Sequence, residues 1–306
     1  MRVAILGAGS YVSRAILPGL LRSTDWEAIL HTRAPEPLTR WAVGRGLPRE
    51  RISVLSSNEF GSRAFDVVVN FVGAGDPRLV NEMGKDILAV TAEWDLRALD
   101  VLRQRPSTGY IFASSGVATG EDFALPREPG APLKAPAPGD HYGRAKAEAE
   151  ARHRERADLS IVDLRLYGFY SAEMGARLGY LVCALLQSLL AGSVLTTDEH
   201  DIARDYLHPD DLVSAIAAVV RSMPLNGAFD LASVAPVRKF ELLGRFREKF
   251  DLQWQVESST AKPNKLNYYS RDRALSRYGF VPQLSALEAV MDQATAFLAD
   301  SPRVPA

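Results

Sequence analysis

The chain has 306 residues, and apolar types make up 47% of them, which is typical of a globular protein and excludes a disordered one. Its 36 basic residues are balanced by 37 acidic ones, so no overall field draws the chain to nucleic acid or to an anionic bilayer. The single cysteine, Cys183, excludes an internal disulfide, and no cysteine or histidine spacing indicates a metal site.

Short strands and helices alternate over the first half of the chain. Residues 2–9 and 27–33 predict strands, and residues 10–23 between them predict a helix. Similar apolar or β-branched runs predict strands at 52–57, 66–73, 109–116 and 160–169, with helices at 79–104 and 142–157. Such runs are typical of strands that are buried on both faces of a sheet. The predicted fold class is therefore α/β, a Rossmann-type doubly wound parallel sheet.

The pattern changes after about residue 170. The stretch 120–140 before it is rich in proline and glycine and predicts a long surface loop. Helices are predicted at 176–191, 238–250 and 285–299, with short strand-like runs around them. We expect a smaller α+β portion at the carboxyl ends of the strands, where α/β proteins bind ligands.

The cellular location is predicted from what the sequence lacks. The N-terminal segment MRVAILGAGS has neither the apolar core nor the cleavage site of a secretory signal. The apolar run at 178–191, which contains Cys183, is too short and too interrupted to span a bilayer. We expect a cytoplasmic protein that has no contact with membranes or nucleic acid, with Cys183 as a buried thiol.

The first strand leads into a glycine-containing turn, GAGSYVS, that opens the first helix. Glycine permits a tight turn, small residues let the backbone approach a pyrophosphate, and the helix N-terminus offers N–H groups to that anion. The sequence therefore predicts dinucleotide binding at Gly7, Gly9, Ser10, Tyr11 and Val12. Because Ser10 and Ser13 stand where glycines are expected, a plain strand-to-helix turn is the alternative.

The second strand ends in the sequence LHTR, which bears on the choice of dinucleotide. NAD sites usually carry an acid here that accepts hydrogen bonds from the ribose hydroxyls. The guanidinium of Arg33 instead suits a 2′-phosphate, which it can hold with two hydrogen bonds. We therefore predict NADP as the cofactor. Glu36 keeps NAD open, and an ordinary surface arginine is a further alternative.

A hydroxyl, a phenol and an ammonium are expected to converge near the nicotinamide. Ser115 follows Ser114 at the end of the fifth strand, while Tyr142 and Lys146 share one face of the next helix. A nearby ammonium stabilises a phenolate and lowers the pKa of the tyrosine from about 10. The phenol can then protonate a carbonyl oxygen while hydride reaches the carbon. An ordinary surface pair of Tyr142 and Lys146 is the alternative.

At this point the chain resembles a known family. The motifs GAGSYVS, DVVVNFVG, FASSGVATG, HYGRAKAEAE, LRLYGFYS and RDYLHPDDL occur in the order and spacing of the extended short-chain dehydrogenase/reductase family. Within it, the chain is similar to the NAD-dependent epimerase/dehydratase group, which acts on nucleotide sugars. The similarity covers nearly the whole chain.

The resemblance implies a set of site residues. The catalytic residues are Ser115, Tyr142 and Lys146. The cofactor site extends to Phe71, Val72, Gly73, Ser114, Tyr142, Lys146 and Tyr167. The substrate contacts are Ser115, Gly168, Arg204 and Lys262, of which Arg204 and Lys262 match phosphate-binding positions. Gly168 stands where the family often has asparagine.

The resemblance, taken with Arg33, leads to a functional hypothesis. It is NADPH-dependent reduction of a 4-keto group on a nucleotide-linked deoxysugar, so the expected partner is a nucleotide-diphosphate sugar. A 4-epimerase with tightly bound NAD and a non-catalytic NADP-binding regulatory protein are the alternatives. A dehydratase is disfavoured because Gly116 and Val117 supply no acid beside Ser115.

The sequence also predicts a domain division and an oligomeric state. Residues 1–170 are expected to form the NADP-binding domain, with 200–232 returning to it. Residues 171–306 are expected to form mainly the substrate-binding portion. The resemblance also implies a homodimer in which the helices at 79–104 and 142–157 meet.

Two aspartates that precede a predicted helix can be explained without a catalytic role. Asp210 and Asp211 stand just before an apolar helical run and are expected to cap that helix. His208 is expected to be a packed or hydrogen-bonded histidine.

Overall fold

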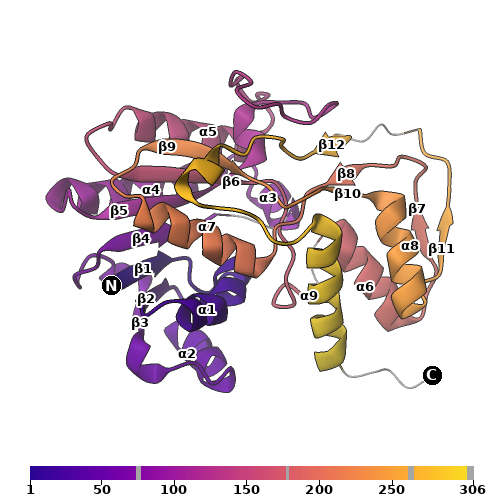
Figure 1. Cartoon of the computed structure of the whole chain (residues 1–306), viewed down its shortest axis with the longest axis horizontal. Coiled ribbons are helices and arrows are strands. Elements are labelled where there is room, and N and C mark those ends of the chain that lie inside the picture. The colour runs from indigo at the N-terminus through magenta and orange to yellow at the C-terminus, as the bar shows by residue number, and fades with distance from the viewer. Residues whose placement is uncertain (74–76, 177–178, 261–264, 302–306) are drawn as a thin grey trace.

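A computed structural model describes residues 1–73, 77–176, 179–260 and 265–301. Seven strands form one wholly parallel sheet in the order β3-β2-β1-β4-β5-β6-β9 (Figure 1). The strands are β1 (Arg2–Leu6), β2 (Glu27–Thr32), β3 (Ile52–Ser56), β4 (Val67–Asn70), β5 (Gly109–Ser115), β6 (Ile161–Leu166) and β9 (Gly227–Leu231). The predicted fold class, a Rossmann-type doubly wound sheet, is confirmed.

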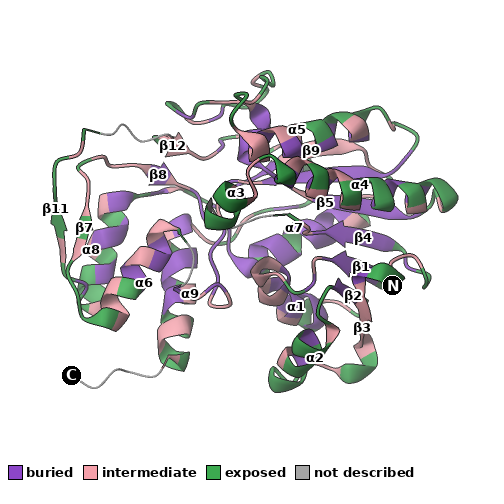
Figure 2. Ribbon diagram, turned by 180° about the vertical axis from the view of Figure 1, so that it is seen from behind, coloured by how far each residue is buried: buried purple, intermediate pink, exposed green. Residues whose placement is uncertain are grey.

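A layer of helices covers each face of this sheet. The first layer consists of α1 (Tyr11–Ser23), α2 (Pro35–Gly44) and α7 (Pro209–Arg221), and the second of α3 (Pro77–Met83), α4 (Asp86–Gln104) and α5 (His141–Arg154). Ile5, Leu17 and Ile216 share the core under the first layer, and Tyr110 and Leu102 share the core under the second. Figure 2 shows the buried strands between the two layers. Burial on both faces explains why the strands are almost entirely apolar.

The strand order reverses at β1, which pairs with β2 on one side and with β4 on the other. Consecutive crossovers therefore leave β1 in opposite directions and open a crevice at the carboxyl ends of the strands. The segments that follow β1, β4 and β5 reach this crevice, and they carry most of the predicted site residues.

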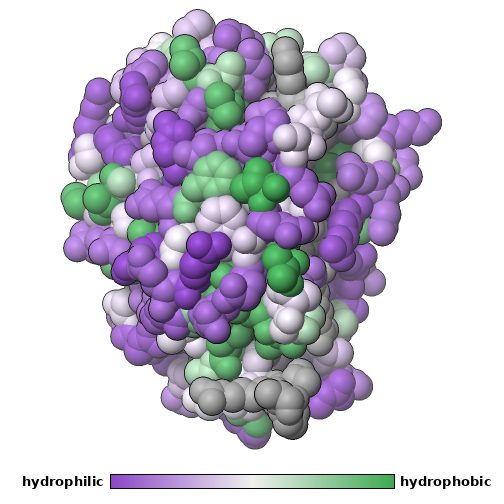
Figure 3. Space-filling view, turned by 90° about the vertical axis from the view of Figure 1, so that its right-hand side faces the viewer, coloured by the Kyte–Doolittle hydropathy of each residue, from purple (hydrophilic) through white to green (hydrophobic). Residues whose placement is uncertain are grey.

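The rest of the chain forms a smaller portion beside the carboxyl ends of the strands (Figure 1). It contains the sheets β10-β8-β12 and β11-β7. Its elements are α6 (Leu181–Ala191), β7 (Leu195–Thr197), β8 (Ala203–Arg204), β10 (Val237–Arg238), α8 (Lys239–Phe250), β11 (Trp254–Val256), β12 (Asn267–Tyr268) and α9 (Ala286–Asp300). The three helices share a core that includes Leu186, Leu243 and Val290. Figure 3 shows mainly hydrophilic side chains over the end of the molecule that this portion forms.

The chain crosses back to the main sheet after β8. Helix α7 packs on α1, where Gly19 lies close to Val213, and β9 then pairs with β6 at the edge of the sheet. Most residues beyond β9 return to the smaller portion, but Leu275 and Phe280 lie in the core under the first helix layer. The portion around the main sheet is therefore built from three separate stretches of the chain.

Two predicted helices differ from the structure. The helix predicted at 79–104 is divided into α3 and α4, because Gly84 adopts a φ of +50° that an α-helix cannot contain. The helix predicted from residue 176 begins at Leu181. Cys183 is buried in this helix, as expected. No helix in the described ranges is long and apolar enough to cross a membrane.

Candidate active site

The turn between β1 and α1 is held by the two serines that replace the expected glycines. Ser10 caps α1 by accepting the backbone N–H of Ser13 at 3.2 Å, and the Ser13 hydroxyl donates to the Gly7 carbonyl at 3.0 Å. Gly7 has a φ of +70°, and a Cβ placed on it would lie 2.9 Å from the carbonyl carbon of Phe71. The turn therefore requires glycine at position 7. At positions 10 and 13, hydrogen bonds of the two serine side chains stabilise the turn.

The segment after β4 lies against this turn. The Asn70 side chain accepts the backbone N–H of Val72 at 2.9 Å, which fixes the backbone beside Gly7. Gly73 follows with a φ of +143°, and a Cβ placed there would lie 3.5 Å from Nζ of Lys146. The predicted cofactor residues of β1 and β4 are thus brought together, and Lys146 adjoins them.

Arg33 is exposed just beyond the carboxyl end of β2. The neighbouring Thr32 places its Oγ1 atom 3.1 Å from where a Cβ on Gly9 would lie. Arg33 therefore lies close in sequence to a residue that touches the dinucleotide turn. Glu36, the residue that kept NAD open, faces Arg40 at 3.9 Å.

The three predicted catalytic residues converge at the end of β5. Asp140 caps α5 by accepting the backbone N–H of Gly143 at 2.8 Å, so Tyr142 lies in the first turn of the helix. Ser115 forms a hydrogen bond with Tyr142 that favours the phenolate. One turn later, Nζ of Lys146 donates to the Ala113 carbonyl at 2.7 Å.

Burial is the main influence on both ionisable groups of this cluster. It raises the pKa of Tyr142 to about 12, while the hydrogen bond from Ser115 acts to lower it. It lowers the pKa of Lys146 to about 8, although nearby carboxylates act to raise it. The acidification of Tyr142 that was expected from Lys146 is not seen, because that ammonium is directed at the backbone of β5. The group that favours the phenolate in this structure is Ser115.

Ser114 forms a hydrogen bond with a buried ion pair that lies below the site. Its hydroxyl donates to Glu150 at 2.5 Å, and Glu150 also accepts the Nε–H of Arg165 at 2.9 Å. Arg165 faces Asp230 on its other side at 3.3 Å. The role of Ser114 that this geometry shows is to join β5 to α5 and β6.

Tyr268 is an additional residue at the site that the sequence reasoning missed. Its hydroxyl lies 3.1 Å from Oγ of Ser115, across 153 positions of sequence. Its ring contacts Phe123 with a centroid separation of 4.7 Å and Tyr167 with one of 5.2 Å. The residue lies in the two-residue strand β12, and so short a strand leaves no periodic signal in the sequence.

Two cations lie beside Tyr268. Strand β12 runs parallel to β8 in a register that pairs Tyr268 with Arg204. Nζ of Lys265 lies 4.8 Å from the Tyr268 ring centroid, and burial, together with the nearby charge of Arg204, lowers the pKa of Lys265. Neither cation has a carboxylate within 4.0 Å among the described residues. The pair is therefore available to an anionic ligand. Lys262, the other predicted phosphate contact, lies outside the described residues.

Tyr167 and Gly168 are both constrained by packing. The Tyr167 hydroxyl donates to Asp230 at 2.9 Å, and its ring lies against Gly116. The Gly168 carbonyl accepts the backbone N–H of Leu207 at 3.0 Å. A Cβ on Gly168 would overlap the carbonyl oxygen of Asp205, so the asparagine that is frequent in the family has no room here.

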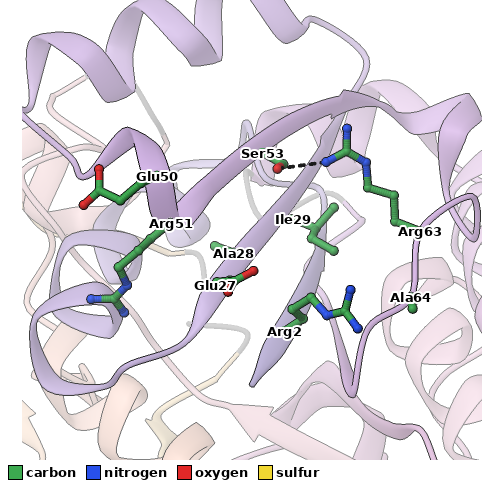
Figure 4. A pocket seen from close by; sticks show the side chains of 9 residues that line it. All are labelled: Arg2, Glu27, Ala28, Ile29, Glu50, Arg51, Ser53, Arg63 and Ala64. Atoms are coloured by element: carbon green, nitrogen blue, oxygen red, sulfur yellow. Dashed lines mark hydrogen bonds between the residues drawn. The ribbon is translucent and has the colours of Figure 1, made fainter.

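A polar cavity at the other edge of the sheet is separate from this site. It is lined by residues at or near the amino ends of β1, β2 and β3 (Figure 4): Arg2, Glu27, Ala28, Ile29, Glu50, Arg51, Ser53, Arg63 and Ala64. Arg63 donates to Ser53 at 3.0 Å, and Arg51 donates to backbone carbonyls such as that of Leu21. Arg51 and Arg63 therefore have structural roles.

The helix cap expected from Asp210 and Asp211 is wrong. His208 is the N-cap of α7, since its Nδ1 accepts the backbone N–H of Asp210 at 3.1 Å. Asp211 instead accepts the backbone N–H of Gln283 at 3.0 Å, which joins α7 to the C-terminal segment. The described residues contain no group of three or more possible metal ligands.

A buried charge network lies behind Lys146. His153, which is fully buried on α5, places one ring nitrogen 2.6 Å from Asp95 and the other 2.6 Å from Asp163. Both ring nitrogens face carboxylates, so both carry protons, and these hydrogen bonds raise the pKa of His153 to about 9 against the effect of burial. Tyr110 extends the network by linking Asp95 to Asn70 of the cofactor segment.

Together, the fold and the site define an enzyme of the extended short-chain dehydrogenase/reductase class that uses a nicotinamide dinucleotide. Residues 3–232 match the NAD dependent epimerase/dehydratase family, and the chain belongs to this family. The family resemblance read from the sequence is thereby confirmed.

Solved structures show the same fold at low identity. UDP-glucose 4-epimerase from Stenotrophomonas maltophila, with NAD and formylated UDP-arabinopyranose, is 15% identical with a TM-score of 0.80 over 98% of each chain. UDP-glucuronic acid 4-epimerase from Bacillus cereus, with UDP-glucuronic acid and NAD, is 16% identical with a TM-score of 0.78 over 98% of this chain and 99% of that one. dTDP-glucose 4,6-dehydratase from Bacillus anthracis, with NAD, is 13% identical with a TM-score of 0.77 over 98% of this chain and 97% of that one. No curated protein sequence matches the chain.

Proposed function

We propose that the enzyme reduces a 4-keto group on a nucleotide-linked deoxysugar with NADPH. The observation that carries this proposal is the convergence of Ser115, Tyr142 and Lys146 next to the glycine turn. The turn fits a dinucleotide, because it leads directly into α1, whose N-terminus offers backbone N–H groups to a pyrophosphate. A bound nicotinamide supplies hydride there.

The protein residues supply placement and a proton. Ser115 holds the carbonyl oxygen of the substrate, and Tyr142 protonates that oxygen as the carbonyl is reduced. Ser115 then favours the phenolate left behind. Lys146 adds positive charge beside Gly73 and the cofactor segment, where it can hold the ribose of the cofactor. The roles of Ser115, Tyr142 and Lys146 are assigned from their positions near the carboxyl end of β5.

The proposed cofactor is NADPH because of Arg33. The described end of β2 carries no carboxylate for the ribose hydroxyls, and an exposed guanidinium suits a 2′-phosphate. The compared structures contain NAD, so NAD is the competing cofactor. NADPH brings a negatively charged 2′-phosphate to Arg33, and NAD does not.

The proposed substrate is a nucleotide-diphosphate sugar. Arg204 supplies charge for its phosphates, and Lys265, which is close enough to feel that charge, lies over the Tyr268 ring. Lys262 and Gly168 remain predicted substrate contacts. Gly168 has no side chain and can contribute only backbone atoms, and packing against Asp205 leaves no room for a larger residue at this position.

Turnover of a defined panel tests the proposal. Purified protein should oxidise NADPH with a 4-keto-6-deoxy nucleotide sugar and not without it, and Tyr142→Phe should abolish this oxidation. The loss of NADPH absorbance follows the reaction. Absence of turnover with uridine, thymidine, cytidine and guanosine keto-sugars would overturn the reductase assignment.

A 4-epimerase is the second candidate, since two of the compared structures are nucleotide-sugar 4-epimerases with NAD. The same three catalytic residues serve it, but the cofactor is then recycled and not consumed. Denaturing the purified protein and identifying the released nucleotide separates the two. Stoichiometric NAD together with interconversion of 4-epimers would support the epimerase.

We also propose the domain division and a homodimer. Residues 1–170 with 200–232 would bind NADP, and the remainder of 171–306 would bind mainly the nucleotide sugar. Helices α4 and α5 lie side by side on one face of the sheet, where Leu96 is 49% exposed. Light scattering on wild type and Leu96→Glu tests the homodimer, which the variant should weaken.

A further inference from the structure

A row of three buried side chains connects α4 to the segment after β4. It consists of Asp95, Tyr110 and Asn70. The Tyr110 hydroxyl lies 3.1 Å from Oδ1 of Asp95, and Nδ2 of Asn70 lies 2.9 Å from the same hydroxyl. The Oδ1 atom of Asn70 in turn lies 2.9 Å from the backbone nitrogen of Val72. The row therefore ends on the backbone of the segment 71–73.

The segment 71–73 lies against two parts of the site. On one side its backbone is 2.9 Å from where a Cβ on Gly7 would be, so it borders the turn that faces a pyrophosphate. On the other side, Nζ of Lys146 is 3.5 Å from where a Cβ on Gly73 would be. A displacement of this segment would therefore change the glycine turn and the surroundings of Lys146 together.

The direction of each hydrogen bond in the row follows from the groups at its two ends. Asp95 is a carboxylate, since Arg152 donates to its Oδ2 through Nε at 3.0 Å and through Nη2 at 2.7 Å. A carboxylate only accepts, so the Tyr110 hydroxyl donates to Asp95 and accepts from Nδ2 of Asn70. At the other end, the backbone N–H of Val72 can only donate, and it requires Oδ1. Both ends therefore specify the same orientation of the Asn70 amide.

Tyr110 and Asn70 are shielded from water, with exposed fractions of 0% and 1%. The Tyr110 ring packs edge-on against His153, with a centroid separation of 5.4 Å. Among the described residues, the Tyr110 hydroxyl is the hydrogen-bond acceptor of Nδ2 of Asn70. Loss of this hydroxyl would leave a buried amide donor unpaired. Rotation of the amide toward another partner would then release the N–H of Val72.

We propose that Tyr110 is a positioning residue of the cofactor site, which acts through the Asn70 side chain to hold the backbone of Val72 in place for the dinucleotide. This inference rests on the proposed function only in that the segment 71–73 borders the bound dinucleotide. The pyrophosphate that the adjoining turn faces is common to NADPH and NADH. Tyr110 should therefore affect both dinucleotides, whereas Arg33 should affect NADPH alone.

Tyr110→Phe removes the hydroxyl and keeps the ring. Its matched control is Tyr170→Phe, because Tyr170 is also buried and its hydroxyl has no hydrogen-bond partner among the described residues. Tyr110→Phe should weaken the binding of NADPH and of NADH by the same factor of about tenfold, which corresponds to the loss of one hydrogen bond. Tyr170→Phe should change neither. In an Asn70→Ala background the effect of Tyr110→Phe on binding should vanish. Unequal losses for the two dinucleotides, or additive effects of the two substitutions, would overturn the proposal.

Hydrogen exchange of the Val72 amide separates this proposal from the proposed function, because it needs neither cofactor nor substrate. Protein labelled with ¹⁵N-valine is followed by NMR, and the Val72 signal is assigned by its loss in Val72→Ile. Tyr110→Phe should accelerate exchange at Val72 about tenfold relative to Val68 and Val69, which are paired within the sheet, and Tyr170→Phe should not.

Equal acceleration at Val68, Val69 and Val72 would show general destabilisation and refute the role of Tyr110, as would unchanged exchange at Val72. Either result counts against Tyr110 whatever the enzyme binds. Failure of the wild type to bind either dinucleotide would instead refute the proposed function.

Discussion

The ammonium of Lys146 donates to the carbonyl oxygen of Ala113 at 2.7 Å, so the lysine is anchored on β5. Its Nζ atom lies 5.8 Å from the centroid of the Tyr142 ring. A spacing of four residues brought the two side chains to one side of α5, but the backbone of the neighbouring strand decides where the charge lies. The lysine thus faces the cofactor segment near Gly73.

Replacing Lys146 should separate activity from stability. Burial lowers its pKa to about 8, so its ammonium is disfavoured in the folded protein. The unfolded chain binds more protons at this site between that value and about 10.4, so the contribution of Lys146 to the free energy of unfolding should rise with pH over this window. Lys146→Met should lower kcat about 100-fold and remove that rise. Urea unfolding between about pH 9 and 10 checks it, because at lower pH the opposite contribution of His153 offsets the rise. The exposed Lys249→Met is the control that keeps the rise.

The buried imidazolium should make stability depend on pH in the opposite direction. The pKa of His153 is about 9 in the folded protein and about 6.5 in the unfolded chain. Its contribution is therefore complete below about pH 6.5 and is lost as the pH rises through about 9. His153→Gln leaves Asp95 and Asp163 without their shared cation and should lower the free energy of unfolding by about 3–5 kcal/mol.

Urea unfolding of wild type from about pH 6 to 8 checks this, because the opposite contribution of Lys146 begins only near pH 8. The decline with pH should be absent in His153→Gln and retained in His200→Gln, which alters a partly exposed histidine. Equal pH slopes in wild type and His153→Gln would show that the imidazolium does not control stability.

The sheet and its connections could be predicted because each strand appears in the sequence as a short apolar run. The runs around Val3, Val68 and Ile111 are buried on both faces, and strands buried in this way can be recognised from their apolar composition alone. The division of the helix predicted at 79–104 was missed, since Gly84 reads as one weak helix residue until its φ is known.

The site could be predicted only where its residues carry a local pattern or match a motif of the family. Tyr142 and Lys146 carry a helix spacing, and Gly7 directly follows a strand. Tyr268 reaches Ser115 through the packing of β12 on β8, and no local pattern records such a contact. Asp140 was missed as well, although an aspartate at the start of a helical stretch is a recognisable cap signal.

Arg33 should control the choice between the two dinucleotides. A guanidinium that meets the 2′-phosphate contributes about 1.5–3 kcal/mol, so Arg33→Ala should weaken NADPH binding at least tenfold and leave NADH binding unchanged. Quenching of tryptophan fluorescence gives both dissociation constants. Arg40→Ala on α2 is the control, because it removes an exposed arginine of the same region. Equal losses for NADPH and NADH would place the 2′-phosphate elsewhere or favour NAD.

Gly7 should be irreplaceable for a reason that Gly44 does not share. Its φ of +70° disfavours any side chain by about 1–2 kcal/mol, and a Cβ would also press on the Phe71 backbone at 2.9 Å. Gly7→Ala should therefore lower the melting temperature and weaken NADPH binding more than tenfold, because the turn and the segment after β4 move apart. Gly44 ends α2 with no atom within 4 Å of its added Cβ, so Gly44→Ala should leave NADPH binding unchanged. Thermal unfolding and NADPH titration of both variants test this difference. If Gly7→Ala binds NADPH as tightly as the wild type, the turn is not part of the cofactor site.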